Sequence, residues 1–197
     1  MEAMTLALPI APEANQLLLR SPLALLIGMV LDQQIPMEKA FSAPYVLAQR
    51  LGRDDLDARE LAGYDPQALV AIFAAPPALH RFPKAMADRV SQVCRALVEH
   101  YDGDAARLWA DPADGRELLA RIAALPGFGR QKAQIFLALL GKRFGVRPPG
   151  WQEAAGDYGD PAAHRSVADV TDAESLRLVR EYKQQMKAAS RAKAADV

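Results

Sequence analysis

The sequence has little cysteine, few aromatic residues and no long apolar run. Cys94 is the only cysteine among 197 residues, which excludes an internal disulfide and any zinc site or iron–sulfur cluster built from several cysteines of one chain. The longest uncharged apolar stretch runs from Ser21 to Leu31 and is too short to cross a bilayer. The first residues include Pro9 and Glu13 and lack a basic start. We therefore expect no secretory signal, no membrane partner and a cytoplasmic location.

An excess of charge of either sign is also absent, because 24 lysine and arginine residues balance 24 aspartate and glutamate residues. Zero net charge would argue against a polyanion as partner, but the charges are unevenly spread. The stretch 121–147 has six basic residues and no acidic one, whereas five acids fall between 54 and 65. The basic residues are Arg121, Arg130, Lys132, Lys142, Arg143 and Arg147. A protein with this asymmetry can bind a polyanion through one face.

Helix signals are frequent, in a sequence of which 51% is hydrophobic. A capping residue precedes proline at Ser21-Pro22 and at Asp65-Pro66, and Pro83 opens a strongly amphipathic segment. We expect a last helix from Asp172 to about Ala189, and a kink or break where Pro44 interrupts an earlier helix. No segment alternates with period two over enough residues to be a strand. The sequence therefore predicts an all-α fold.

Two glycines stand in a short segment between helices, Leu125–Ala133. Gly127 and Gly129 permit a tight reversal and remove side chains that would block the approach of another backbone. The second helix would begin at this turn, where its free N–H groups suit a phosphate. The alternative is an ordinary helical hairpin in which Gly127 only ends the first helix. The acid-free surroundings, with Arg130 and Lys132 closest, favour phosphate contact.

The run Leu125-Pro126-Gly127-Phe128-Gly129, followed by a basic residue, resembles the hairpin of the helix-hairpin-helix (HhH-GPD) DNA glycosylase superfamily. Three further segments are similar to that family, in the same order along the chain. Leu25–Pro36 resembles its early helix and glutamine-bearing loop, Lys84–Asp104 its long helix before the hairpin, and Leu139–Phe144 the segment that leads to its catalytic loop. The resemblance covers roughly residues 20–150.

The resemblance implies one domain over residues 1–197, a bundle with two helical lobes and a DNA-binding cleft between them. One lobe would span residues 21–135, with the helix-hairpin-helix at about 115–141, and the second would combine residues 1–20 with 142–197. The implied protein is a monomer that associates with the nucleoid. It would flip a damaged base of double-stranded DNA into the cleft, because the glycosidic bond cannot be reached within the base stack.

The same resemblance assigns the DNA contacts to the hairpin, to the loop after the early helix and to the end of the second hairpin helix. These residues are Gln34, Gly127, Phe128, Gly129, Arg130, Gln131, Lys132, Lys142 and Arg143. The hairpin carbonyls would hold a monovalent cation, and no other cofactor is implied. No His, Asp or Glu spacing is typical of a transition-metal site. Gln34 would fill the gap left by the flipped nucleotide, or else it is a polar helix-end residue that caps backbone groups.

Two departures from the family pattern concern the chemistry. Bifunctional members carry a nucleophilic lysine where this chain has Gln131, and an amide forms no Schiff base, so we expect no lyase activity. The family's catalytic aspartate falls where Pro149 or Gly150 stands here. The nearest carboxylates, Glu153 and Asp157, are our candidates for the catalytic role. The alternative is that both are exposed loop acids.

Trp151 and Tyr158 flank these acids in a chain with only 7% aromatic residues. Either ring could stack on an extruded base in a base pocket, or Trp151 could instead anchor the Pro-Pro-Gly loop to the core. The sequence therefore predicts a monofunctional DNA glycosylase of base-excision repair. Two alternatives remain: a non-catalytic DNA-binding protein that retains the glycosylase fold, and a helical interaction module that does not bind DNA.

Overall fold

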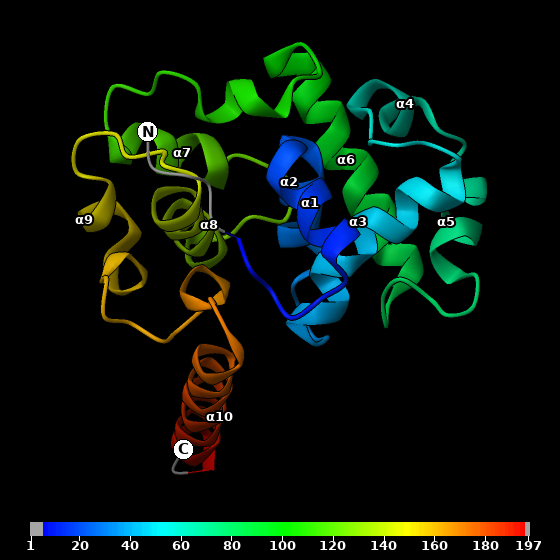
Figure 1. Cartoon of the computed structure of the whole chain (residues 1–197). Coiled ribbons are helices and arrows are strands. Elements are labelled where there is room, and N and C mark those ends of the chain that lie inside the picture. The colour runs from blue at the N-terminus through cyan, green and yellow to red at the C-terminus, as the bar shows by residue number, and fades with distance from the viewer. Residues whose placement is uncertain (1–5, 196–197) are drawn as a thin grey trace.

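The computed structural model describes residues 6–195, and the regular structure in this range is entirely helical (Figure 1). The prediction of an all-α fold is confirmed. In chain order the helices are α1 (Pro12–Arg20), α2 (Pro22–Leu31), α3 (Met37–Leu51), α4 (Ala58–Gly63), α5 (Pro66–Ala74), α6 (Pro83–Tyr101), the 3-10 helix η1 (Ala105–Trp109), α7 (Gly115–Ala123), α8 (Arg130–Arg143), α9 (Trp151–Ala155), the 3-10 helices η2 (Gly156–Gly159) and η3 (Val167–Asp169), and α10 (Ala173–Ala195). No single helix in the described range is long and apolar enough to span a membrane.

Several helices begin where local capping chemistry predicts. The Ser21 hydroxyl accepts a hydrogen bond from the backbone of Ala24 ahead of α2, and the Asp65 carboxylate accepts one in the same way ahead of α5. α3 continues through Pro44 as one helix, so the predicted break does not occur there. Buried residues such as Phe41 occur on both sides of that proline. Packing therefore outweighs the one backbone hydrogen bond that proline removes.

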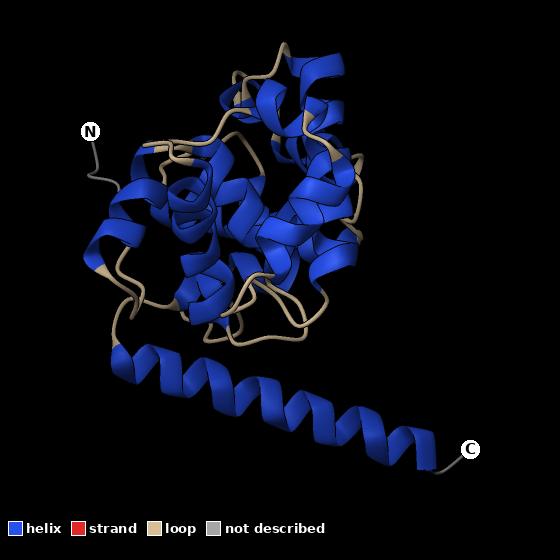
Figure 2. Cartoon of the chain, turned by 90° about the vertical axis from the view of Figure 1, so that its right-hand side faces the viewer, coloured by secondary structure: helices blue, strands red, loops and turns tan. Residues whose placement is uncertain are grey.

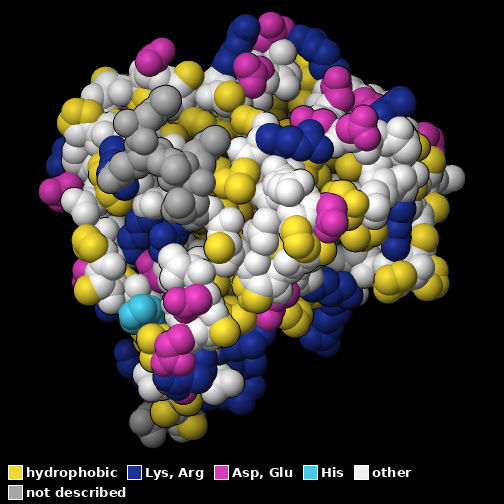
Figure 3. Space-filling view, viewed as in Figure 1, with side chains coloured by type: hydrophobic (Ala, Val, Ile, Leu, Met, Phe, Trp, Pro, Cys, Tyr) yellow, Lys and Arg dark blue, Asp and Glu magenta, His cyan; other side chains and the backbone are white. Residues whose placement is uncertain are grey.

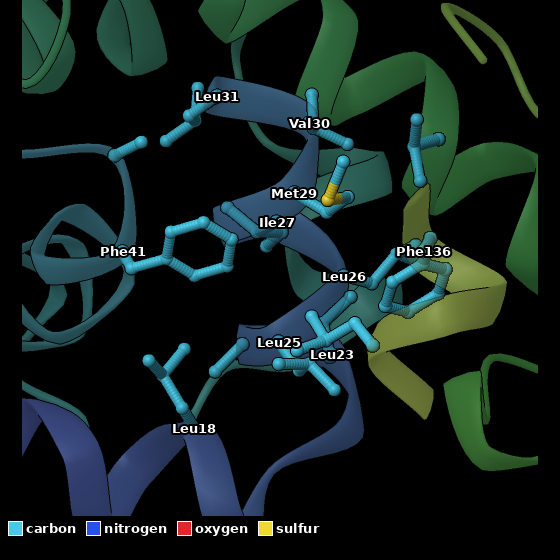
Figure 4. Packing of buried hydrophobic residues seen from close by; sticks show 14 of the residues in the cluster. Leu18, Leu23, Leu25, Leu26, Ile27, Met29, Val30, Leu31, Phe41 and Phe136 are labelled. Carbon is cyan, nitrogen blue, oxygen red and sulfur yellow. The ribbon is translucent and has the colours of Figure 1, made fainter. Parts of the chain in front are cut away.

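α2 is the central helix of the molecule. Every residue from Leu23 to Leu31 is buried. Phe41 of α3 lies on one side of α2 and Phe136 of α8 on the other, and both rings are fully buried (Figure 4). A helix that is apolar all round must be covered on all sides. α2 therefore joins the early helices and the hairpin helices in one continuous core.

Two groups of helices lie on either side of α2 (Figure 1). α1 packs against α2 and α3, and α4 and α5 pack against α6, whereas α8 packs against α7, α9, η2 and η3. The prediction placed residues 1–20 with residues 142–197. In the described part of the first segment, α1 contacts the early helices instead, because Leu17 and Leu18 are buried against them. α7, which the prediction assigned to the first lobe, packs mainly against α8 and α9, and α8 crosses the predicted lobe boundary at residue 135.

α10 extends from the body as a long, largely exposed helix (Figure 2). Its buried residues all lie in the first two turns. Beyond them, Arg180 forms an ion pair with Glu38 of α3. The helix continues to Ala195, further than the predicted end near Ala189.

Candidate nucleic-acid interface

The predicted hairpin joins α7 to α8, and its two glycines are exposed. Gly127 has a φ of 82°, and Gly129 stands at the start of α8 without a side-chain cap. The first N–H groups of α8 therefore have no partner within the helix and point out of the hairpin. Arg130, the first residue of α8, is also exposed. This part of the hairpin offers backbone donors and one cation to a phosphate.

Phe128 lies differently from its two glycine neighbours. Its side chain is 5% exposed, and its ring centroid lies 6.2 Å from that of Phe136 in the core. Its backbone N–H donates to the carbonyl of Leu125 at 3.1 Å. The predicted DNA contact of Phe128 is thus limited to its backbone, because the side chain anchors the hairpin to the core.

Arg89 of α6 lies over the hairpin at Gly127. The sequence does not reveal this contact, because the two residues belong to different helical segments. A Cβ atom built on Gly127 would lie 2.3 Å from Nη1 of Arg89 and 2.8 Å from its Cδ. Glycine at position 127 permits the positive φ, and any side chain there would also have to displace Arg89.

Lys132 points inward and fastens the hairpin helix to the end of α2. Its ammonium donates a hydrogen bond to the carbonyl of Val30 at 3.0 Å and lies 5.8 Å from the centroid of the Phe128 ring. Burial lowers the pKa of Lys132, and the negative charge of Asp32 works against that shift. Lys132 was predicted to bind DNA. In the structure its ammonium holds the start of α8 against the end of α2, and the two bonded residues lie 102 positions apart in the chain.

His80 holds the loop between α2 and α3 from the other side. Its Nε2 lies 3.2 Å from the carbonyl oxygen of Leu31 and 3.0 Å from that of Gln33, and its Nδ1 accepts a hydrogen bond from the backbone of Phe82 at 3.0 Å. The proton of the neutral ring is thus assigned to Nε2, which donates to the two carbonyls. Burial lowers the pKa of His80. In the same loop the predicted wedge residue Gln34 is exposed, with a φ of 58°.

Replacing His80 by leucine should lower the free energy of unfolding by about 1–3 kcal/mol, because the buried carbonyl of Leu31 and the partly buried carbonyl of Gln33 lose their donor. The substitution should also change the pH dependence of stability. The folded-state pKa of His80 is lowered, so the unfolded chain takes up this proton first as the pH falls through about 6.5. The wild type should therefore lose stability between about pH 7 and pH 5 more steeply than the variant.

Urea unfolding at a series of pH values measures both effects. His100→Leu is the matched control, because the side chain of His100 is 62% exposed. Equal pH dependence in the wild type and in His80→Leu would contradict the assigned role of His80.

Gln131 and Tyr158, both predicted site residues, are in direct contact. The side-chain amide of Gln131 donates to the Tyr158 hydroxyl at 2.8 Å. One turn further along α8, Gln134 donates to the carbonyl of Ala154 at 3.2 Å. These bonds attach α9 and η2 to the start of α8, so the half-buried Tyr158 ring lies next to the hairpin.

Trp151 packs on the other end of α8. A Cβ atom built on Gly141 would lie 2.4 Å from Cζ3 of the indole ring, so the ring rests directly on the α8 backbone. Trp151 also lines a pocket of about 510 Å³. The other polar or charged side chains of this pocket include Lys142, Arg143, Gln152, His164 and Asp169. The geometry accommodates both interpretations of Trp151, as an anchor and as a pocket wall.

Lys142 and Arg143, both predicted DNA ligands, form contacts with other parts of the protein. The Lys142 ammonium lies 2.5 Å from Oδ1 of Asp169 and also donates to the Asp160 carbonyl at 2.7 Å. The two side chains of the ion pair are only 10% and 3% exposed. Arg143 donates to the Ala168 carbonyl at 2.9 Å. Both cations therefore hold η3 against α8, because a buried ammonium needs a counter-charge and acceptors.

The two predicted catalytic carboxylates share a shallow depression of about 410 Å³. Glu153 and Asp157 are both exposed, and Arg165 lies in the same depression. The Asp157 carboxylate forms an ion pair with Arg165 at 3.4 Å, and its side chain is 80% exposed. The structure thus brings Glu153 and Asp157 together but leaves both in contact with solvent.

The uneven charge of the sequence is visible on the surface. In Figure 3, acidic and basic side chains lie side by side around α4, and basic side chains are frequent along α10, together with some acidic ones. Among residues 6–195 no group of three or more His, Cys, Asp or Glu side chains could hold a metal ion. No protein-family model, curated protein or solved structure matches this chain.

Proposed function

We propose that this protein is a monofunctional DNA glycosylase, which binds duplex DNA and hydrolyses the N-glycosidic bond of a flipped, damaged base. The observation that carries the proposal is the contact between the hairpin helix and the last turn of α2, which leads directly into the glutamine-bearing loop. The hydrogen bond from the Lys132 ammonium to the Val30 carbonyl thus places the hairpin next to the loop that carries Gln34, and the family resemblance assigns both the hairpin and this loop to DNA. The hairpin would hold the DNA backbone while the exposed Gln34 enters the duplex.

The side chains around the hairpin support hydrolysis rather than lyase chemistry. Gln131 offers an amide to the site, and its nitrogen is engaged with Tyr158. Lys132, the nearest amine, is directed to the Val30 carbonyl. Water is then the nucleophile, and the expected product is an intact abasic site.

Base release from damaged duplexes tests this function. Duplexes that carry uracil, hypoxanthine, an alkylated purine or oxidised guanine are incubated with the protein, and abasic sites are detected by strand cleavage after alkali. We expect cleavage at one class of lesion, only after alkali. A protein that binds these duplexes and releases no base would instead be the non-catalytic DNA-binding protein, an alternative that the solvent exposure of Glu153 and Asp157 favours.

The same assay tests the predicted carboxylates. If Glu153 or Asp157 is catalytic, the double variant Glu153→Gln/Asp157→Asn loses base release by about 100-fold or more. Full activity in the double variant would contradict these two assignments and leave the proposed glycosylase function intact.

A further inference from the structure

Asp32 occupies a position that is unfavourable for a carboxylate. It is the first residue after α2, and its backbone N–H donates to the Met29 carbonyl at 3.3 Å. The C-terminal end of a helix carries partial negative charge, which repels an anion. The carboxylate of Glu38 adds to this repulsion.

Nothing in the described part of the chain compensates the Asp32 carboxylate directly. It forms no ion pair within 4.0 Å and accepts no hydrogen bond among residues 6–195. Lys132 and Lys183 attract it only from a greater distance, and burial raises its pKa. Burial of an unpaired carboxylate costs stability, and such groups concentrate at functional sites.

Other aspartates of the chain have evident structural roles. Five of them accept backbone hydrogen bonds at helix starts: Asp57, Asp65, Asp104, Asp114 and Asp172. Asp169 accepts hydrogen bonds from the backbone of Arg165 and Ser166 and pairs with Lys142. Asp32 has no role of this kind.

The backbone around Asp32 is nevertheless held firmly. His80 binds the carbonyl groups of Leu31 and Gln33, which flank Asp32 on both sides. Lys132 binds the carbonyl of Val30 two residues earlier. The backbone that carries this partly buried carboxylate is thus fixed between the hairpin helix and the loop that carries Gln34, and a fixed backbone is part of the preorganisation that electrostatic catalysis requires.

We propose that Asp32 is the carboxylate that faces the flipped nucleotide and stabilises the positive charge that develops on its sugar. This inference rests on the proposed glycosylase function. As the bond between C1′ and the base nitrogen breaks, its electron pair leaves with the base and C1′ becomes electron-poor. A water oxygen then bonds to C1′, and the proton that the water loses ends on the departed base. Asp32 stays ionised throughout and acts by its charge.

Binding of a stable cationic analogue tests this role without knowledge of the damaged base. One duplex carries a pyrrolidine abasic-site analogue, whose ring nitrogen is protonated, and a second carries the neutral tetrahydrofuran analogue. The wild type should bind the pyrrolidine duplex at least about tenfold more tightly than the tetrahydrofuran duplex, since a carboxylate faces the ring cation. Asp32→Asn keeps the side-chain size and removes the charge, so this preference should disappear.

Asp111→Asn is the matched control, because this aspartate is exposed and has no part in the proposed site, and it should retain the preference. We also expect Asp32→Asn to be at least as stable as the wild type, because a desolvated charge is removed. A merely structural role for Asp32 would lower stability and leave the preference unchanged. If the asparagine variant does not fold, Asp32→Ser tests the same prediction.

The outcomes separate this inference from the function on which it rests. An unchanged preference in the Asp32 variant would overturn the role of Asp32 and leave the glycosylase function in place. If the wild type binds neither analogue duplex more tightly than an undamaged duplex, the glycosylase function fails and the role of Asp32 fails with it. If the Asp32 variant loses the preference and the control variant keeps it, the result supports both the role of Asp32 and the glycosylase function.

Discussion

Replacing Asp169 by alanine is expected to lower the free energy of unfolding by about 3–5 kcal/mol. The substitution leaves the Lys142 ammonium without its counter-charge, in a place where that side chain is only 10% exposed. It also removes the acceptor for the backbone N–H groups of Arg165 and Ser166 at the start of η3. η3 packs on α8, so the loss should extend to the packing of α10, whose first turns rest on η3.

Asp157→Ala is the matched control for this prediction. Asp157 also forms an ion pair, with Arg165 at 3.4 Å, but its side chain is 80% exposed. An exposed pair contributes only about 0–1 kcal/mol, so this variant should unfold almost as the wild type does. Urea unfolding of the two variants measures the difference. Equal and small losses would show that Lys142 is not held by a buried ion pair.

The second large effect is expected at the hairpin, where Gly127→Val should lower the affinity for duplex DNA at least about tenfold. A β-branched residue is strained at a φ of 82°, at a cost of about 1–3 kcal/mol. Its side chain also displaces the Arg89 guanidinium, because even a Cβ atom would lie 2.3 Å from Nη1. Both effects move the hairpin backbone, whose N–H groups should hold the phosphates.

Two further glycine variants separate backbone strain from DNA contact. Gly145→Val introduces the same kind of strain at a φ of 68°, in open space away from the hairpin, and should leave the affinity unchanged. Gly129 has an ordinary φ of −73°, and a Cβ atom there meets nothing within 4 Å. Gly129→Ala should therefore keep the stability but reduce the affinity, since its methyl group points to the DNA side. Unchanged affinity in both Gly127→Val and Gly129→Ala would contradict the hairpin assignment.

Local signals in the sequence were sufficient to predict the fold class and the first residues of several helices. The capping bonds of Ser21 and Asp65 reach only three residues along the chain, so they can be predicted from neighbouring residues. The positive φ at Gly127 likewise follows from the Gly-x-Gly spacing at a turn. These features depend on local chemistry and hardly on the rest of the molecule.

Tertiary partners could not be predicted in the same way. Lys142 and Arg143 lie in an acid-free stretch and resemble phosphate ligands, but their partners Asp169 and Ala168 come 27 and 25 residues later in the chain. The same holds for Lys132, whose partner in α2 is still more distant. A count of charges along the sequence does not reveal which cations fold inward.

The sequence does not single out Asp32 or His80 either, because their environment is built from several helices. One signal was nevertheless available. Asp32 directly follows the fully buried, apolar α2, and so lies at the negative end of a core helix without a neighbouring base in the sequence. His80 carries no such signal, since its partners lie at the end of α2 and in the loop after it, almost 50 residues away in the chain.

The proposed function and the role of Asp32 both require that the hairpin side binds the backbone of duplex DNA. The affinity of the wild type and of Arg130→Gln for an undamaged duplex, measured between 50 and 200 mM salt, tests this most directly. With about four phosphate contacts, the wild-type affinity should fall about 100-fold over this range. The slope of log affinity against log salt concentration should be smaller for Arg130→Gln, by about the amount that one phosphate contact contributes. An affinity that does not depend on salt, or a slope that Arg130→Gln leaves unchanged, would contradict DNA binding by this face.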